Sequence, residues 1–221
     1  MSFEKGLQHL KTINRHKASV MESCFRMGLV RQGLLHDLSK YAPVEFLVGA
    51  RYYQGDRSPN NAEREDLGLS YSWLHHKGIN KHHFEYWLDY GIQCDTIIKG
   101  VPIPRQYVAE MIADRIAASK VYLGDSYSVT SPYTYLDRSL DHLWFVHDEV
   151  KEQLRYLLGM LAVRGETQTF AYIRRIYLKD RKQPWTRPED FDTIIQAADE
   201  AVQKDTKTKA AMEHCGDSVT A

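Results

Sequence analysis

The residue types most able to do chemistry in this chain are gathered around an adjacent histidine and aspartate, His36 and Asp37. An imidazole beside a carboxylate suits a divalent cation of borderline or hard character. Further residues of the same two types lie before and after the pair: His16, His75, His76, His82, His83 and Asp114. If the fold brings these side chains together, they form a metal site that can activate water or dioxygen.

Four of these candidates have other interpretations when each is taken alone. His36 and Asp37 could be a C-terminal cap and a surface acid. His16 lies between two cationic residues, which is typical of a surface position. Asp114 follows apolar residues on an expected helix, so its carboxylate must be paired or bound to a cation, and the neighbouring Arg115 could be its partner. Lys40 stands three residues after Asp37 and could contact a substrate phosphate, orient Asp37 or compensate a helix dipole. The combination of residues, rather than any one of them, favours a metal site.

Four histidines occur within the nine residues 75–83. We expect His75 and His76 to end one helix and His82 and His83 to begin the next, with a turn between them. One histidine of each pair could then face the same point, and we favour His76 and His82 because they lie nearest the turn. The alternative is a solvated turn in which the histidines have no ligand role.

The composition argues against several classes of protein. Lys and Arg together number 29, as do Asp and Glu, so the formal net charge is zero and no broad nucleic-acid surface is expected. No apolar run reaches the ~20 residues that span a bilayer, so we expect no membrane association. The three cysteines are scattered, which favours a reducing cytoplasm over a disulfide framework.

The apolar periodicity is helical along most of the chain and predicts an all-α fold. Helices are expected over these ranges: 16–30, 33–41, 43 onward, 62–76, 82 onward, 105–123, 135–163, 167–178 and 187–204. One small β-hairpin is expected near 95–103, with its turn at Lys99 and Gly100. Thr186 and Glu189 predict a capping box for the last helix. We divide the chain into a helical metal-binding domain, 1–180, and a C-terminal helix with a loosely ordered tail, 181–221.

The residues quoted above resemble the motif of the HD superfamily of metal-dependent phosphohydrolases. That motif is a histidine, an adjacent His-Asp behind apolar residues, and a distal aspartate, here His16, His36-Asp37 and Asp114. The resemblance covers roughly residues 10–125. It departs from the superfamily in one respect, since only residues 17–35 separate His16 from His36, which is fewer than usual.

The resemblance implies an HD-domain-like helical bundle with a C-terminal helical extension, and one or two divalent metal ions among Mn, Co, Mg, Fe, Ni and Zn. His16, His36, Asp37 and Asp114 would hold the first ion. The cluster of His75, His76, His82 and His83 would hold a second ion or supply acid–base and phosphate contacts. Its spacing departs from that of dinuclear members.

The implied reaction is hydrolysis of a phosphomonoester or phosphodiester, for example a nucleotide, with Asp37, Lys40 and His82 as catalytic residues. Lys40 would neutralise charge on the phosphoryl oxygens. Two alternatives stay open: a di-iron HD-type oxygenase that cleaves a C–C or C–P bond, and a non-catalytic metal-stabilised module. Homo-oligomerisation also stays open.

Overall fold

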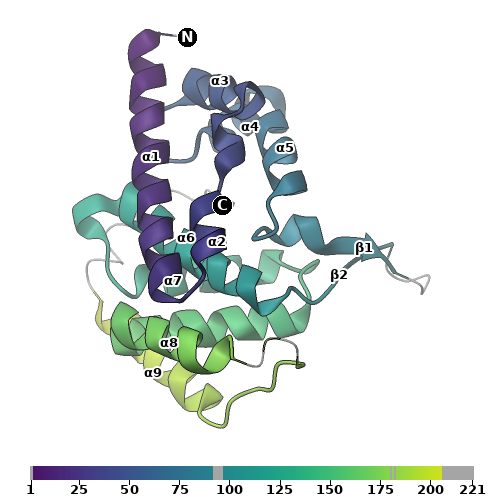
Figure 1. The fold of residues 1–221 in the computed structure, drawn as a ribbon, viewed down its shortest axis with the longest axis vertical. Coiled ribbons are helices and arrows are strands. Elements are labelled where there is room, and N and C mark those ends of the chain that lie inside the picture. Colours follow the sequence, from purple (N-terminus) through teal and green to yellow (C-terminus); the bar gives the residue numbers. More distant parts are fainter. Residues whose placement is uncertain (1, 92–96, 180, 182, 206–221) are drawn as a thin grey trace.

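The computed structural model describes residues 2–91, 97–179, 181 and 183–205 of the chain. These residues form an all-α fold with one small two-stranded sheet (Figure 1). The α-helices are α1 Phe3–Arg26, α2 Val30–Leu35, α3 Pro43–Tyr52, α4 Pro59–Leu67, α5 Tyr71–Ile79, α6 Arg105–Leu123, α7 Ser131–Ser139, α8 Asp148–Tyr172 and α9 Phe191–Lys204. None of the helices in these ranges combines the length and the apolar character needed to cross a bilayer.

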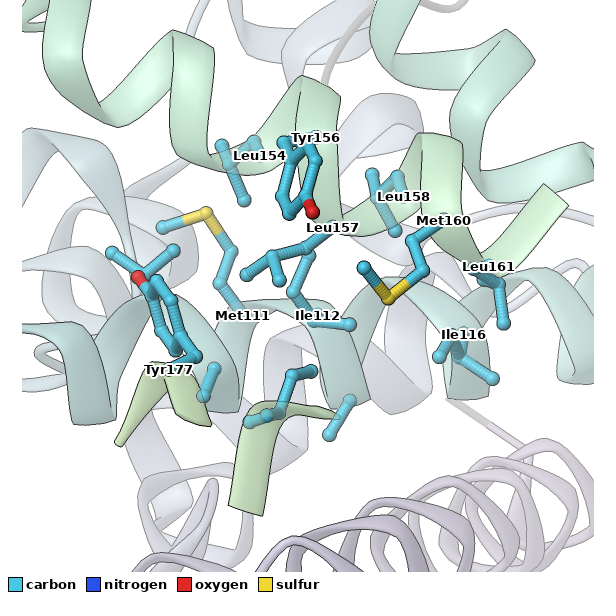
Figure 2. Packing of buried hydrophobic residues seen from close by; sticks show 14 of the residues in the cluster. Met111, Ile112, Ile116, Leu154, Tyr156, Leu157, Leu158, Met160, Leu161 and Tyr177 are labelled. Atoms are coloured by element: carbon cyan, nitrogen blue, oxygen red, sulfur yellow. The ribbon is translucent and has the colours of Figure 1, made fainter. Parts of the chain in front are cut away.

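The hydrophobic core lies where α6 packs between α1 and α8 (Figure 1). Figure 2 shows Met111, Ile112 and Ile116 of α6 beside a row of apolar side chains from α8. That row consists of Leu154, Tyr156, Leu157, Leu158, Met160 and Leu161, all nearly inaccessible to solvent. Burial of each such side chain contributes about 1.5–3 kcal/mol, so this packing holds α6 in place.

Helix α1 also packs on α3, and α3 packs in turn on α4 and α5. Helices α1, α3, α5 and α6 therefore surround the region into which the candidate metal ligands project. Helix α9 packs on α8, and its residues Phe191, Ile194 and Ala198 belong to the same core cluster as those of α6 and α8.

Several predicted elements are confirmed, and the break after α2 is an important exception. Helix α6 and the start of α3 at Pro43 are as expected. The predicted helix over 33–41 is wrong, because α2 ends at Leu35 and Asp37 takes a left-handed conformation with φ of 52°. A short 3₁₀ turn, Leu38–Tyr41, follows. His36 and Asp37 therefore lie at a break in the helical path.

The expected single helix over 62–76 is two helices. Gly68, with φ of 77°, ends α4, a conformation that suits glycine because it lacks a Cβ atom. The hydroxyl of Ser70 then accepts a hydrogen bond from the Trp73 amide and caps α5, which continues past Gly78 to Ile79. His82 and His83 precede a 3₁₀ turn, Phe84–Trp87, rather than opening an α-helix.

The expected helix over 135–163 is also divided. Helix α7 ends at Ser139, a 3₁₀ turn covers Leu140–His142, and the His147 side chain caps the start of α8. Helix α8 then runs to Tyr172 with a kink at Gly165, and a π-helical turn, Ile173–Tyr177, follows it. The predicted capping box is wrong, since α9 begins at Phe191 after Asp190.

The small sheet pairs β1, Leu88–Tyr90, with β2, Ile98–Gly100, in antiparallel register. Lys99 and Gly100 thus lie in a strand and not in the predicted turn, while residues 92–96 lie outside the described residues. A Cβ atom on Gly100 would stand 2.3 Å from the Phe145 carbonyl oxygen, so the strand can approach that backbone only because residue 100 is glycine. The tail predicted beyond residue 205 lies outside the described residues.

Candidate metal centre

Four of the predicted ligands converge from three separate parts of the chain. His16 comes from α1, His36 and Asp37 from the break after α2, and Asp114 from the middle of α6. The distance from His16 Nε2 to Asp114 Oδ1 is 2.9 Å, and that from His36 Nε2 to the same oxygen is 3.6 Å. One ligand atom from each of the four residues lies within 4.8 Å of the others.

The left-handed conformation of Asp37 explains how two adjacent residues face one point. On a continuous helix, neighbouring side chains point about 100° apart and do not face each other. With φ of 52° at Asp37, His36 Nε2 lies 3.3 Å from Asp37 Oδ2. A non-glycine residue in this conformation is uncommon, although aspartate tolerates it better than most, and such outliers cluster at functional sites.

A second group of candidate ligands shares Asp37 with the first. It consists of Asp37, His76, His82 and His83. Asp37 Oδ1 lies 3.3 Å from Nε2 of His76 and 3.3 Å from Nε2 of His82, whereas Oδ2 faces His36. One carboxylate oxygen of Asp37 therefore faces each group.

The side-chain atoms that converge here are buried and, among the described residues, have no hydrogen-bond partner. They are Nε2 of His16, His36, His76, His82 and His83 and both carboxylate oxygens of Asp37. Several are close to one another without hydrogen-bond geometry. A buried polar atom left without a partner costs about 1–3 kcal/mol, so a cluster of them pointing inward requires an explanation. A bound cation supplies one, because all of these atoms can donate a lone pair to it.

Two glutamates that the sequence interpretation missed hold the opposite nitrogens of these imidazoles. His36 Nδ1 donates a hydrogen bond to Glu110 Oε1 at 3.0 Å, and His76 Nδ1 donates one to Glu45 Oε2 at 2.8 Å. His82 Nδ1 lies 3.2 Å from Glu110 Oε1. A proton on Nδ1 leaves the Nε2 lone pair free, and carboxylates in this outer position are usual for metal-binding histidines.

The two glutamates had only weak signals in the sequence. Glu110 precedes Asp114 by one helical turn and so lies on the same face of α6. Glu45 lies in the first turn of α3, where an acidic residue is ordinarily explained by the helix dipole.

The structure does not bring His75 into either group. Its Nδ1 lies 2.6 Å from Glu45 Oε1, and its side chain is 37% exposed, compared with 3% for His76. Because α5 continues through both residues, their side chains leave the helix in different directions. Of this pair, His76 is the residue that faces Asp37.

The electrostatics of the cluster favour ionised carboxylates. Burial opposes the charge on Asp37 and Asp114, but the neighbouring imidazoles, and Lys40 in the case of Asp37, hold both pKa values well below the usual range. Lys40 Nζ lies 2.7 Å from Asp37 Oδ2. Burial opposes the charge on Lys40 as well, but the two carboxylates outweigh it and raise its pKa.

One cavity, open to solvent, leads to this centre. The residues that line it include His16, Lys40, His76, His83 and Asp114. His82 does not line the cavity and is 2% exposed, although we expected it to act in catalysis. His83 lines the cavity, and burial together with the adjacent His82 and His76 holds its pKa well below the ordinary value, so its imidazole is neutral.

A model for DUF5662, a family of unknown function, matches residues 5–160. The chain belongs to this family. No curated protein and no solved structure gives a significant match. The DUF5662 match runs from the first turns of α1 into α8, and it includes all seven residues of the two groups and the two glutamates behind them. Helix α9 of this DUF5662 member lies beyond the matched residues.

Proposed function

We propose that this protein is a metal-dependent phosphohydrolase of the HD type that acts on a phosphomonoester or phosphodiester. The observation that carries the proposal is the convergence of unpartnered lone pairs around Asp37, beside an open cavity that His16, His76 and His83 line. The ligand set of imidazoles and carboxylates fits one or two divalent ions. A nucleotide is the example of a substrate that we test first.

The two groups of residues would hold two ions. His16, His36 and Asp114 would bind the first, and His76, His82 and His83 the second, with one oxygen of Asp37 directed to each group. When bound, divalent ions lower the pKa of coordinated water from 15.7 to about 7 and polarise phosphoryl oxygens. Glu110 and Glu45 would keep the imidazoles oriented for this task.

Lys40 is the cation best placed to contact the substrate. Its ammonium lies against Asp37, lines the cavity and is 32% exposed along its side chain. It can therefore donate to a phosphoryl oxygen without leaving Asp37, and a fixed positive charge there stabilises the negative charge that develops during phosphoryl transfer. Neutral His83, which lines the same cavity, can exchange a proton with a leaving oxygen or complete the second ligand set.

Elemental analysis with a phosphatase screen tests this proposal. Protein purified without a chelating tag is analysed for metal, and nucleotides, small phosphate esters and a phosphodiester are offered with Mn²⁺, Co²⁺ and Mg²⁺. We expect turnover that falls at least about 10³-fold in Asp114→Asn, because both a ligand and a charge at the centre are altered. The exposed Asp125 provides the matched control, and Asp125→Asn should retain activity.

Three other results would contradict hydrolysis at this centre. Bound iron with dioxygen consumption by coloured protein would assign the site to an oxygenase. Bound metal with no turnover in any condition would leave a metal-stabilised module. Equal activity in Asp114→Asn and Asp125→Asn would place the reaction elsewhere.

A further inference from the structure

His9 is a buried histidine that the proposed metal centre does not use. It lies on α1 two helical turns before His16, and it is 8% exposed. Its Nδ1 is fully buried and has no hydrogen-bond partner among the described residues. Buried polar side chains are normally hydrogen-bonded, so an imidazole without a partner indicates a group that a ligand completes.

The chain leaves space for this imidazole. On α3, a Cβ atom at Gly49 would stand 2.3 Å from His9 Nε2, so any larger residue would displace the ring. The ring also lies near two aromatic side chains, at centroid distances of 5.5 Å from Phe46 and 5.7 Å from Tyr53. The position of the imidazole is therefore fixed by packing before any ligand binds.

The wall around His9 is polar but uncharged. The hydroxyls of Thr12 and Tyr53 share a hydrogen bond at 2.8 Å beside it. Burial, with a smaller effect of Lys40, lowers the pKa of His9 to about 4, so the imidazole is neutral at physiological pH. Such a wall can both donate and accept hydrogen bonds, and it does not attract an ionic group.

This wall and the metal centre share one cavity. His9, Thr12, Gly49 and Tyr53 line it together with His16 and Asp114. His9 and His16 are seven residues apart on one helix, which corresponds to about 10 Å at 1.5 Å per residue. A substrate whose phosphate lies at the metal centre can therefore extend along α1 to His9.

We propose that His9, with Thr12 and Tyr53, forms a recognition subsite for an uncharged hydrogen-bonding group of the substrate, located about 10 Å from the reacting phosphorus. The group is a hydroxyl, an amide or a ring nitrogen. The proposal rests on the proposed function, because it takes the phosphate to lie at the metal centre. It excludes a substrate that consists of little more than the phosphate ester itself, since such a molecule would leave the His9 end empty.

Binding of hydrolysis-resistant probes to Mn²⁺-loaded protein tests the subsite by calorimetry. Methylphosphonate is the short probe, and the methylenephosphonate analogues of the four ribonucleoside 5′-monophosphates are the long ones. We expect at least one long probe to bind about 10-fold more tightly than methylphosphonate, the advantage that one or two hydrogen bonds provide. His9→Phe, which keeps a ring of similar size, should remove that advantage without changing methylphosphonate affinity.

Two further variants separate recognition from folding. Gly49→Ala displaces the ring and should also remove the advantage, whereas Gly6→Ala on α1, where an added Cβ meets nothing within 4 Å, should not. His9→Gln keeps a hydrogen-bond donor and an acceptor, so it should restore part of the affinity advantage of the long probe. The inference is overturned if no long probe binds better than methylphosphonate, or if His9→Phe weakens both kinds of probe equally.

The failure of this inference differs from the failure of the proposed function. If the subsite is wrong, hydrolysis of small phosphate esters and metal content stay intact while the probes show no dependence on His9. If the protein is not a phosphohydrolase, Mn²⁺-loaded protein turns over no ester and binds no methylphosphonate, and the subsite proposal falls with it.

Discussion

Glu110 Oε1 lies 3.0 Å from His36 Nδ1 and therefore links α6 to the break after α2. The same oxygen lies 3.2 Å from His82 Nδ1. One carboxylate thus orients an imidazole from each of the two groups of candidate ligands. Burial opposes its charge, but hydrogen bonds from His36 and His82 lower the pKa of Glu110, so it remains ionised.

Removal of this carboxylate should weaken metal binding without removing any ligand. We expect Glu110→Gln to lower Mn²⁺ or Zn²⁺ affinity about 10–100-fold, which is the usual effect of losing an outer partner of a metal-binding histidine. Calorimetric titration of metal-free protein measures it. Glu200→Gln, on the exposed face of α9, is the control. Equal affinities in the two variants would show that Glu110 has no part in a metal site.

His75 and His76 are neighbours with different predicted roles. His76→Ala should lower metal affinity at least about 10-fold, because it removes an Nε2 that faces Asp37 at 3.3 Å. His75→Ala should change it less than about 3-fold, since His75 contacts the outer carboxylate of Glu45 and, among the described residues, belongs to neither group of candidate ligands. Competition with a chelating dye for the metal ion measures the affinities of both variants under the same conditions. The reverse order of effects would contradict the assigned ligand set.

The left-handed backbone at Asp37 predicts an unusual order of stabilities. Both Asp37→Gly and Asp37→Ala lose the carboxylate, but only alanine is strained at φ of 52°. The strain of about 1–2 kcal/mol exceeds the unfolded-state entropy cost of glycine, about 0.4–1 kcal/mol. In urea unfolding of metal-free protein, Asp37→Gly should be the more stable by roughly 0.5–1 kcal/mol.

A helical position supplies the comparison for that prediction. At Glu200 on α9, alanine should be more stable than glycine by about 1 kcal/mol, the normal order in a helix. The same order at position 37 would mean that the left-handed break after α2 does not form.

His9 should make stability depend on pH in a defined window. Its folded pKa of about 4 lies below the ordinary 6.5, so the unfolded chain takes up the proton first as pH falls. The stability associated with neutral His9 is complete above pH 6.5 and is lost as pH falls from there toward 4. Between pH 7 and 5, the free energy of unfolding of His9→Phe should fall by about 2 kcal/mol less than that of the unsubstituted protein. Urea unfolding in the presence of a chelator measures the free energy of unfolding of both proteins at each pH. Equal decreases in the two proteins would contradict a neutral buried His9.

The convergence of distant ligands could be anticipated from residue type and order, but its geometry could not. His16 and His36 could be named from the combination of residue types and their order, and Asp114 also because an apolar helix seldom carries a carboxylate without a partner. The helix expected through His36 and Asp37 was wrong, because local propensity gives no sign that residue 37 will be left-handed. The Asp37 carboxylate at this position contacts imidazoles from distant parts of the chain, such as His76 and His82, whose Nε2 atoms each lie 3.3 Å away.

The positions of the outer carboxylates, Glu45 and Glu110, and of the wall around His9 depend on contacts that the sequence spacing does not reveal. Glu45 reaches His76 from a helix 31 residues earlier in the chain. Gly49 matters only because α3 packs against α1 at His9, and a glycine within a predicted helix gives no indication of which residue it accommodates. The helix expected over 135–163 is divided at a 3₁₀ turn and at the His147 cap of α8, a local feature that the apolar periodicity did not indicate.

The central claim is that Asp37 and the imidazoles around it bind a cation, and anomalous diffraction from crystals grown with Mn²⁺ tests it most directly. We predict one or two strong anomalous peaks among His16, His36, Asp37, Asp114 and the second histidine group, each about 2.0–2.3 Å from Asp37 or an Nε2 atom. The absence of any peak within bonding distance of Asp37 at saturating Mn²⁺ would contradict the account.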